Sequence, residues 1–417
     1  MKALRRSLVC LGVGVAAATA AWLIHKAGWL DRPELVTWDV RERWLGAAAP
    51  SDVPIKLILI DQSSLDWARE QAGSPWPWPR EFYTKIIDFC KAGNAKAIAF
   101  DLFFSEPSMF GQDDDNRFAE ALKSTRATVL AVPPGPHLSQ PAGWPEGIPP
   151  SPFQITGLEQ WIRSHPQADL SLNSAVMSLP EISENASLLG HVRADQDADS
   201  IIRRLAPIVT FDGQVLPALS LAAFEVSQVS DRARIPEFQV TENSLVFDGH
   251  AIPLDHEGLA VLRYRKPTLR GDQRRMYEAF SAAGIINSQL AIEERKTPQV
   301  SPEVFKDCYV FIGTSAAGTY DLKPTPVNKA GPGVEVQAAF LDNLLYNGFI
   351  HSSNPAWTIL FTLILSIIAV FATRESRNSF HVVSAFVLML PAPWLTGFVA
   401  YTSGWQWPIV LPEVGVC

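Results

Sequence analysis

IKLILID at residues 55–61 decides the fold, because it reads as a buried strand that ends in an aspartate. The run is apolar apart from Lys56, which is typical of a strand covered on both faces. Residues 80–91 then show the helical spacing of apolar side chains, and Gly93 stops that helix. A second run, KAIAFD at residues 96–101, again ends in an aspartate. Strand, helix and strand in this order predict a parallel pair of strands joined by a right-handed crossover.

The rest of the middle region continues the α/β pattern. A proline-rich excursion loop is expected at residues 133–152. Residues 238–247 and 260–264 alternate in character and are expected to form antiparallel strands. The fold class is therefore α/β, with a mixed, partly parallel sheet and helices. The other expected elements are strands at 127–132, 205–211 and 307–313, and helices at 114–123, 217–225 and 334–346.

An uncharged, mostly apolar run opens the chain at residues 7–24. Lys2, Arg5 and Arg6 precede it, which predicts a cytoplasmic amino terminus and places the following residues across the membrane. A run of about 18 residues is long enough to span the hydrocarbon core. A cleaved signal peptide is the alternative, because Ala-Thr-Ala at residues 18–20 offers small side chains near the end of the run.

Two further apolar runs, at residues 356–373 and 380–401, predict a helical hairpin in the membrane. Arg374 and Arg377 lie between them and place that turn in the cytoplasm, in agreement with the amino-terminal signal. We expect the inner membrane as the location. The expected organisation is a start and first membrane helix at 1–30, an extracytoplasmic domain at 31–353, membrane helices at 354–375 and 376–403, and an outer loop with the possible start of another span at 404–417.

Composition and charge exclude one class of partner. The net charge of the 417 residues is −8, so no basic face is expected to neutralise the phosphates of nucleic acid. No C-x-x-C motif occurs, and neither a metal nor a cofactor is expected. Cys90 and Cys308 are the cysteines able to pair within the domain, but buried free thiols are the favoured interpretation.

Three aspartates follow predicted strands directly or after a loop: Asp61, Asp101 and Asp321. Open parallel sheets bind ligands at the carboxyl ends of their strands, so these residues are candidate ligand contacts. Glu106 and the run Asp113–Asp115 add negative charge, which suits a cation or an amine-bearing ligand. The alternative is structural: strand-end aspartates often cap turns, and an aspartate run can be the solvated start of a helix.

Ser315 lies in the turn Gly313–Gly318, which has the two glycines of a phosphate-binding loop. Thr319 and Tyr320 stand where such a loop needs lysine and serine or threonine, so this interpretation fails. A nucleophile elbow fails as well, because Ala317 replaces its second glycine. A tight turn whose backbone amides could bind a small anion remains.

Asp195, Asp197 and Asp199 alternate as calcium-loop ligands do. Ser200 and Ala206 stand where that loop needs glycine and glutamate, so a polar hairpin loop explains the pattern better.

The string Trp76-Pro77-Trp78-Pro79-Arg80 combines two stiff prolines with two large aromatic faces. It is either an aromatic wall or lid of a ligand site, or a structural cover for the sheet edge that fixes the start of the following helix. Trp76, Trp78 and Arg80 are therefore candidate ligand contacts.

With these residues in place, the chain resembles the type-two CHASE domain, an extracytoplasmic sensor attached to bacterial cyclases, histidine kinases and serine/threonine kinases. The matching pieces follow the family order and span most of residues 31–348. They are Leu59–Asp61 with Ser64-Leu65, Trp76–Arg80, Ala99–Glu106 with the aspartate run, Pro217–Leu221, Ile252–Asp255, Phe311–Ser315 with Asp321, and Pro332–Ala338.

The resemblance implies a membrane-anchored sensor with no catalytic activity of its own, which passes its signal through membrane helices to a cytoplasmic output domain. No kinase, cyclase or phosphodiesterase region is present in this chain. Gln337 stands where the family often has histidine, and Asp199-Ser200 where it has Asp-Gly. The ligand is an unknown small molecule or envelope protein, and a homodimer is possible.

Two other functions compete with the sensor. An extracytoplasmic hydrolase could use the carboxylates of Asp61, Asp101 and Glu106, although the histidines of the domain fall in no recognisable motif. An envelope assembly partner would instead present an exposed aromatic patch around Trp76 and Trp78.

Overall fold

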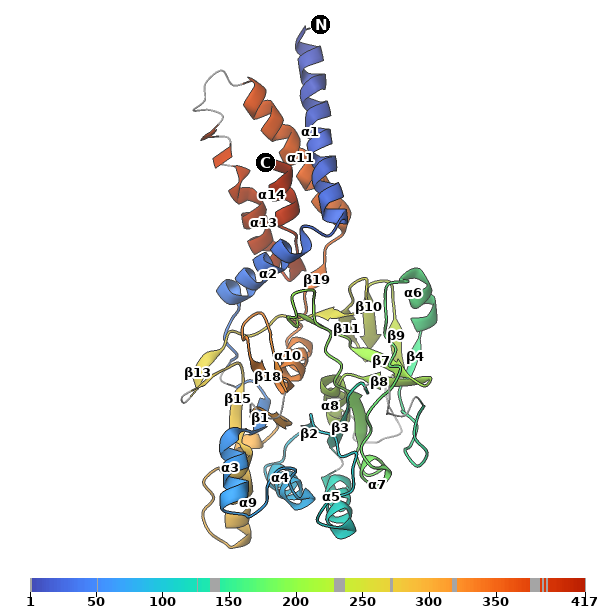
Figure 1. Cartoon of the computed structure of the whole chain (residues 1–417), viewed down its shortest axis with the longest axis vertical. Helices are drawn as coiled ribbons and strands as arrows, with labels where there is room; N and C mark the ends of the chain where they lie inside the picture. The colour runs from blue at the N-terminus through green and yellow to red at the C-terminus, as the bar shows by residue number, and fades with distance from the viewer. Residues whose placement is uncertain are drawn as a thin grey trace. The chain divides into compact units, whose positions relative to one another are not determined.

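The computed structural model describes residues 2–50, 52–125, 127–135, 143–228, 237–270, 273–316, 321–375, 383–384, 386–387 and 389–416. The chain divides into two compact units (Figure 1). One, the helical unit, contains Met1–Gly46 and Ile350–Cys417, and the other, the α/β unit, contains Ala47–Phe349.

A six-stranded sheet forms the centre of the α/β unit, and every neighbouring pair in it is parallel. This confirms the α/β fold class. In spatial order its strands are β15 (Glu278–Ser281), β1 (Ile55–Ile60), β16 (Tyr309–Thr314), β2 (Ala97–Phe100), β3 (Thr128–Val132) and β5 (Leu188–His191).

The predicted pair of β1 and β2 is wrong in one respect. The two strands are parallel, but β16 lies between them, with Leu57 opposite Phe311 and Phe311 opposite Ala99. All six residues of β16 are buried, which suits an apolar strand in the centre of the sheet. A crossover helix sets only the direction of two strands, so a strand from much later in the chain can enter between them.

Side chains of the strands alternate between two buried faces. Ile58 and Ile60 pack into a cluster with α4 (Arg80–Ala92), α5 (Gln112–Thr125) and α9 (Ala282–Glu293). Leu57 and Leu59 point to the opposite cluster, which α8 (Leu219–Gln228) and α10 (Val334–Leu345) cover. Helices on both faces explain why β1 reads as a nearly continuous apolar run rather than an alternating one.

A smaller four-stranded sheet has both parallel and antiparallel pairs. The predicted strand 238–247 is two strands of this sheet. The predicted strand 260–264 contributes only the short strand β12 (Ala260–Val261), which pairs outside this sheet with β6 (Arg204–Leu205). The prediction 205–211 also divides, at Pro207, into two strands. The sheet contains β11 (His250–Pro253), β10 (Ser244–Phe247), β9 (Glu237–Val240) and β4 (Gln154–Thr156). The small pairs are β6 (Arg204–Leu205) with β12 (Ala260–Val261), β7 (Ile208–Phe211) with β8 (Gln214–Pro217), β13 (Thr268–Arg270) with β14 (Gln273–Arg275), and β17 (Leu322–Lys323) with β18 (Gly331–Pro332).

The remaining helices of the α/β unit are α3 (Gln62–Glu70), α6 (Leu158–Ser164), α7 (Pro180–Ser183) and the 3₁₀ helix η1 (Pro302–Phe305). The described parts of the expected excursion loop, 133–135 and 143–152, contain no helix and no named strand, apart from an isolated bridge of Pro134 to Ala175, while 136–142 lie outside the described residues.

The helical unit has two helices that are long and apolar enough to cross a membrane, at Ser7–Lys26 and Pro355–Thr373. Their close approach depends on Gly14, since a Cβ there would lie 2.8 Å from the Cα of Ile367. Of the predicted turn at 374–379, residues 376–379 lie outside the described residues, and the third span is described only in part. The elements are α1 (Lys2–Lys26), α2 (Asp31–Leu45), β19 (His351–Ser352), α11 (Pro355–Glu375), α13 (Pro391–Thr402), β20 (Trp405–Gln406) and α14 (Val410–Val416).

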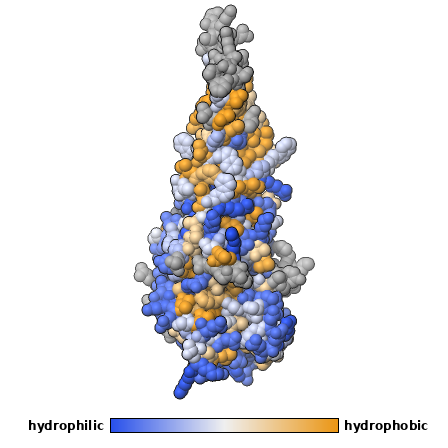
Figure 2. All heavy atoms as spheres, turned by 90° about the vertical axis from the view of Figure 1, so that its left-hand side faces the viewer, coloured by the Kyte–Doolittle hydropathy of each residue, from blue (hydrophilic) through white to orange (hydrophobic). Residues whose placement is uncertain are grey.

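Figure 2 shows the contrast between the two units on one face. Hydrophobic residues dominate the surface of the helical unit, and hydrophilic residues cover much of the α/β unit. Within the helical unit, Glu34 accepts hydrogen bonds from the amides of Ile409 and Val410, and so caps α14. Of the predicted outer segment 404–417, residues 404–416 are described, and these hydrogen bonds hold it within the helical unit.

We expect Gly190→Ala to destabilise the α/β unit by about 1–3 kcal/mol, because α8 begins in direct contact with β5. A Cβ at Gly190 would lie 2.6 Å from the Cα of Leu219, and backbone atoms do not move aside cheaply. Gly284→Ala is the matched control, since a Cβ there meets nothing within 4 Å and Gly284 lies inside α9. That exchange is expected to stabilise by roughly 0.5–1 kcal/mol. Denaturant unfolding of the purified full chain checks both, and equal effects would refute the close contact.

Candidate functional site

A cavity of about 830 Å³ opens at the carboxyl ends of four strands of the parallel sheet. It is lined by Asp101 after β2, Pro133 after β3, Val192 after β5 and Thr314 at the end of β16. Its volume falls in the range of ordinary small-molecule sites, and its place is the one where open parallel sheets bind ligands.

Six of the eight predicted contact residues line this cavity, and two do not. The ones that the cavity brings together are Trp76, Trp78, Arg80, Asp101, Glu106 and Asp321. Asp61 and Ser315 are not among its lining residues. The lining also includes residues that the sequence did not single out, among them Tyr83, Phe103, Met109, Phe110 and Lys323.

Asp61 has a structural role, as the alternative interpretation proposed. Its Oδ1 accepts hydrogen bonds from the amide of Ser64 at 2.8 Å and from the hydroxyl of Ser281 at 3.1 Å, which caps α3. Ser315 donates its amide to the carbonyl of Ile60. Residues 317–320 of the predicted anion-binding turn lie outside the described residues. The hydrolase hypothesis loses its proposed third carboxylate, because Asp61 does not reach the cavity.

Arg80 is held in a buried ion pair at the wall of the cavity. Its Nε donates to Oδ1 of Asp115 at 2.9 Å, and its Nη2 donates to the carbonyl of Glu106 at 2.6 Å. Asp114 accepts the backbone amides of Arg80 and Glu81 and so caps α4. The prediction of a solvated aspartate run is wrong for these two residues, since tertiary contacts with the start of α4 bury both of them.

Asp101 and Asp321 form a pair of carboxyl groups with perturbed protonation. Burial, together with the negative charge of Asp321, raises the pKa of Asp101 to about 8, against the opposing charge of Lys323. Burial also raises the pKa of Asp321 to about 6, against the effects of Lys323 and of a hydrogen bond from Thr314. The Nζ of Lys323 lies 4.0 Å from Oδ1 of Asp321. At neutral pH the site therefore holds a proton that a bound cation can displace.

Aromatic side chains make up one wall of the cavity. Trp76 packs against Trp78 with ring centroids 5.9 Å apart, and Trp78 is buried against Phe82 and Tyr83. The two predicted roles of this string divide between its tryptophans. Trp78 anchors the start of α4 in the core, while Trp76 is exposed and lines the cavity.

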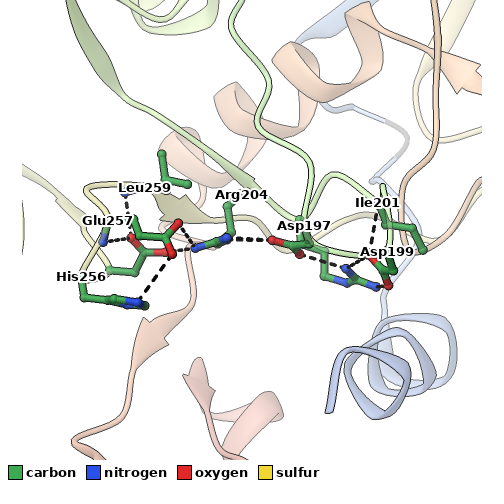
Figure 3. A network of polar contacts seen from close by, with 9 residues as sticks. Asp197, Asp199, Ile201, Arg204, His256, Glu257 and Leu259 are labelled. Carbon is green, nitrogen blue, oxygen red and sulfur yellow. Dashed lines mark hydrogen bonds and ion pairs between the residues drawn. The ribbon is translucent and has the colours of Figure 1, made fainter. Parts of the chain in front are cut away.

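The alternating aspartates after β5 are held by arginines rather than arranged around an ion (Figure 3). Asp197 accepts from Arg203 at 2.9 Å and from Arg204 at 2.8 Å, and Asp199 accepts from Arg203 at 2.7 Å. These hydrogen bonds from Arg203 lower the pKa of Asp199. Among the residues that the structure describes, no group of His, Cys, Asp and Glu side chains is arranged for a metal ion.

Ser200 has a φ of +66° in the turn of this loop, a conformation that glycine adopts without strain. This explains why glycine suits the position in the family that the chain resembles. Gln337 lines the cavity, and its Oε1 accepts hydrogen bonds from the amide and hydroxyl of Ser220 at the start of α8. Cys90 and Cys308 are buried free thiols, which confirms the favoured interpretation.

Comparison with known proteins gives one match. The family model of the CHASE2 domain matches residues 14–372, which is most of the chain. This family consists of extracytoplasmic sensory domains. No curated protein and no solved structure matches the chain.

Proposed function

The chain belongs to the CHASE2 domain family, and we propose that its α/β unit is a sensor that detects a small molecule outside the cytoplasm. The proposed ligand site is the cavity at the carboxyl ends of β2, β3, β5 and β16. Binding would shift the domain between two states, and the change would pass through α1 and α11 to a cytoplasmic output domain. We place the chain in the inner membrane, and a second copy of the chain is its expected partner in signalling.

One observation supports the proposal most strongly. Six predicted contact residues, which come from separate segments between positions 76 and 321, line a single cavity. The two apolar helices at the ends of the family match support membrane anchoring. Trp29 and Trp44 are exposed on the helical unit close to these helices in sequence, as expected for aromatic residues at a membrane interface.

Ser105→Trp tests whether this cavity is the sensing site. Ser105 is exposed and lines the cavity, so a tryptophan there fills part of the space at little cost in stability. We expect the small-molecule fraction of an envelope extract to raise the melting temperature of the purified full chain, and Ser105→Trp to abolish the rise.

Lys296→Trp is the control, because Lys296 is exposed and does not line the cavity. It is expected to keep the full thermal shift. An equal thermal shift in the Ser105→Trp variant would indicate that the ligand binds at another site. The absence of any shift in the parent chain would favour the envelope assembly partner over a sensor of small molecules.

A further inference from the structure

The cavity is negatively charged once its own ion pairs are taken into account. Its carboxylates are Asp101, Glu106 and Asp321, and its cations are Arg80 and Lys323. Arg80 is neutralised by Asp115, and Lys323 lies beside Asp321. Among the described residues, Asp101 and Glu106 have no cation within ion-pair distance. The cavity therefore offers a ligand two carboxyl groups that have no ion-pair partner, and its two cations are already engaged.

The aromatic residues around these carboxylates add a second, independent feature. Trp76, Phe103 and Phe110 are exposed at the cavity and present π faces with no role in the core. Aromatic faces attract ammonium groups through cation–π interactions. The guanidinium of Arg80 already makes such a contact, 4.8 Å from the ring centroid of Phe104.

We propose that the cavity recognises an organic cation, namely an ammonium group attached to an apolar portion, with Asp101 as its main counterion. Asp101 receives the ammonium group, and Trp76, Phe103 and Phe110 enclose the apolar portion. This inference rests on the proposed sensor function and specifies the ligand class of the same site.

Binding of such a cation is coupled to release of a proton. The titratable groups that line the cavity with Asp101 are Asp321, Lys323, Glu106, Arg80 and Tyr83, and the charges of Asp321 and Lys323 act on Asp101 directly. Burial and the charge of Asp321 keep Asp101 largely protonated at neutral pH, since they raise its pKa. A bound ammonium favours the ionised carboxylate and displaces that proton. Affinity for the cation is therefore expected to increase between pH 6 and pH 8, by up to about tenfold per pH unit.

Calorimetric titration of the purified full chain with matched probes tests the ligand class. The cations are benzylamine, phenethylamine and acetylcholine, and the neutral controls are benzyl alcohol, phenethyl alcohol and the uncharged carbon isostere of acetylcholine. We expect at least one cation to bind about ten- to a hundredfold more tightly than its neutral control. We also expect proton release on binding, seen as a heat that depends on the ionisation enthalpy of the buffer.

Asp101→Asn is expected to weaken cation binding by about ten- to a hundredfold and to remove its pH dependence. Asp66→Asn is the control, because Asp66 is an exposed carboxylate outside the cavity, and it is expected to change neither. Failure of all the cations to bind, equal binding of a neutral control, or binding that survives Asp101→Asn would overturn the proposal. A thermal shift by envelope extract that Ser105→Trp abolishes would in those cases preserve the sensor and reject only the ligand class.

Discussion

Arg80→Met is expected to lower the free energy of unfolding of the α/β unit by about 3–5 kcal/mol. The variant leaves the carboxylate of Asp115, whose side chain is 0% exposed, without its cation. It also removes the hydrogen bond from Arg80 to the carbonyl of Glu106, which holds the loop at the cavity. The cost is large because an uncompensated buried charge must either be neutralised by a proton or draw water into the core.

Arg69→Met is the matched control for this prediction. Arg69 pairs with Asp66 and Glu70 on the surface, where its side chain is 62% exposed. Its loss is expected to change stability by less than about 1 kcal/mol. Denaturant unfolding of the two purified variants gives the comparison. If Arg80→Met lowered the free energy of unfolding as little as Arg69→Met does, the pair with Asp115 would not hold the loop.

Glu335→Gln is expected to stabilise the α/β unit by about 3 kcal/mol at pH 8 and to have almost no effect at pH 4. Glu335 lies in the first turn of α10, and burial raises its pKa from 4.5 to about 7, against the opposing charge of Arg275. The folded chain therefore holds a proton that the unfolded chain releases between these two values. The contribution of protonated Glu335 to stability is complete below pH 4.5 and is lost as the pH rises through 7.

Unfolding curves at several pH values check this prediction. Glutamine has the shape of protonated glutamate and cannot ionise, so the variant should lack the loss of stability between pH 4.5 and 7. Glu294→Gln is the control, since Glu294 is exposed and its exchange should leave the pH dependence unchanged. A stabilisation of Glu335→Gln that is the same at pH 4 and pH 8 would contradict the role assigned to burial.

The sequence predicted the parallel α/β sheet well because buried strands leave a strong local signal. Runs such as 55–60 and 309–314 are apolar throughout, and the aspartates after them mark strand ends. The order of the strands left no such signal, since nothing local says that β16 lies between β1 and β2. β15 was missed because its four residues are only partly buried and carry Glu278.

Part of the candidate site could also be predicted, because strand ends leave a local signal in the sequence. Asp101 and Asp321 follow strands of one sheet, so their common place at its edge follows from topology. The role of Asp61 was open, and hydrogen bonds to Ser64 and Ser281 assign it to the start of α3. The contact of Arg80 with Asp115 depends on how α4 and α5 pack, and sequence periodicity does not determine that packing.

Labelling of Met109→Cys in intact cells tests the central claim most directly, because Met109 lies at the cavity and is 74% exposed. The background is Cys417→Ser, in which the remaining cysteines Cys10, Cys90 and Cys308 are buried. Asn378→Cys, in the turn predicted to be cytoplasmic, is the control. We predict that a membrane-impermeant thiol reagent labels Met109→Cys in intact cells, and Asn378→Cys only after the membrane is opened. Labelling of Met109→Cys only after the membrane is opened would place the cavity in the cytoplasm and contradict an extracytoplasmic sensor.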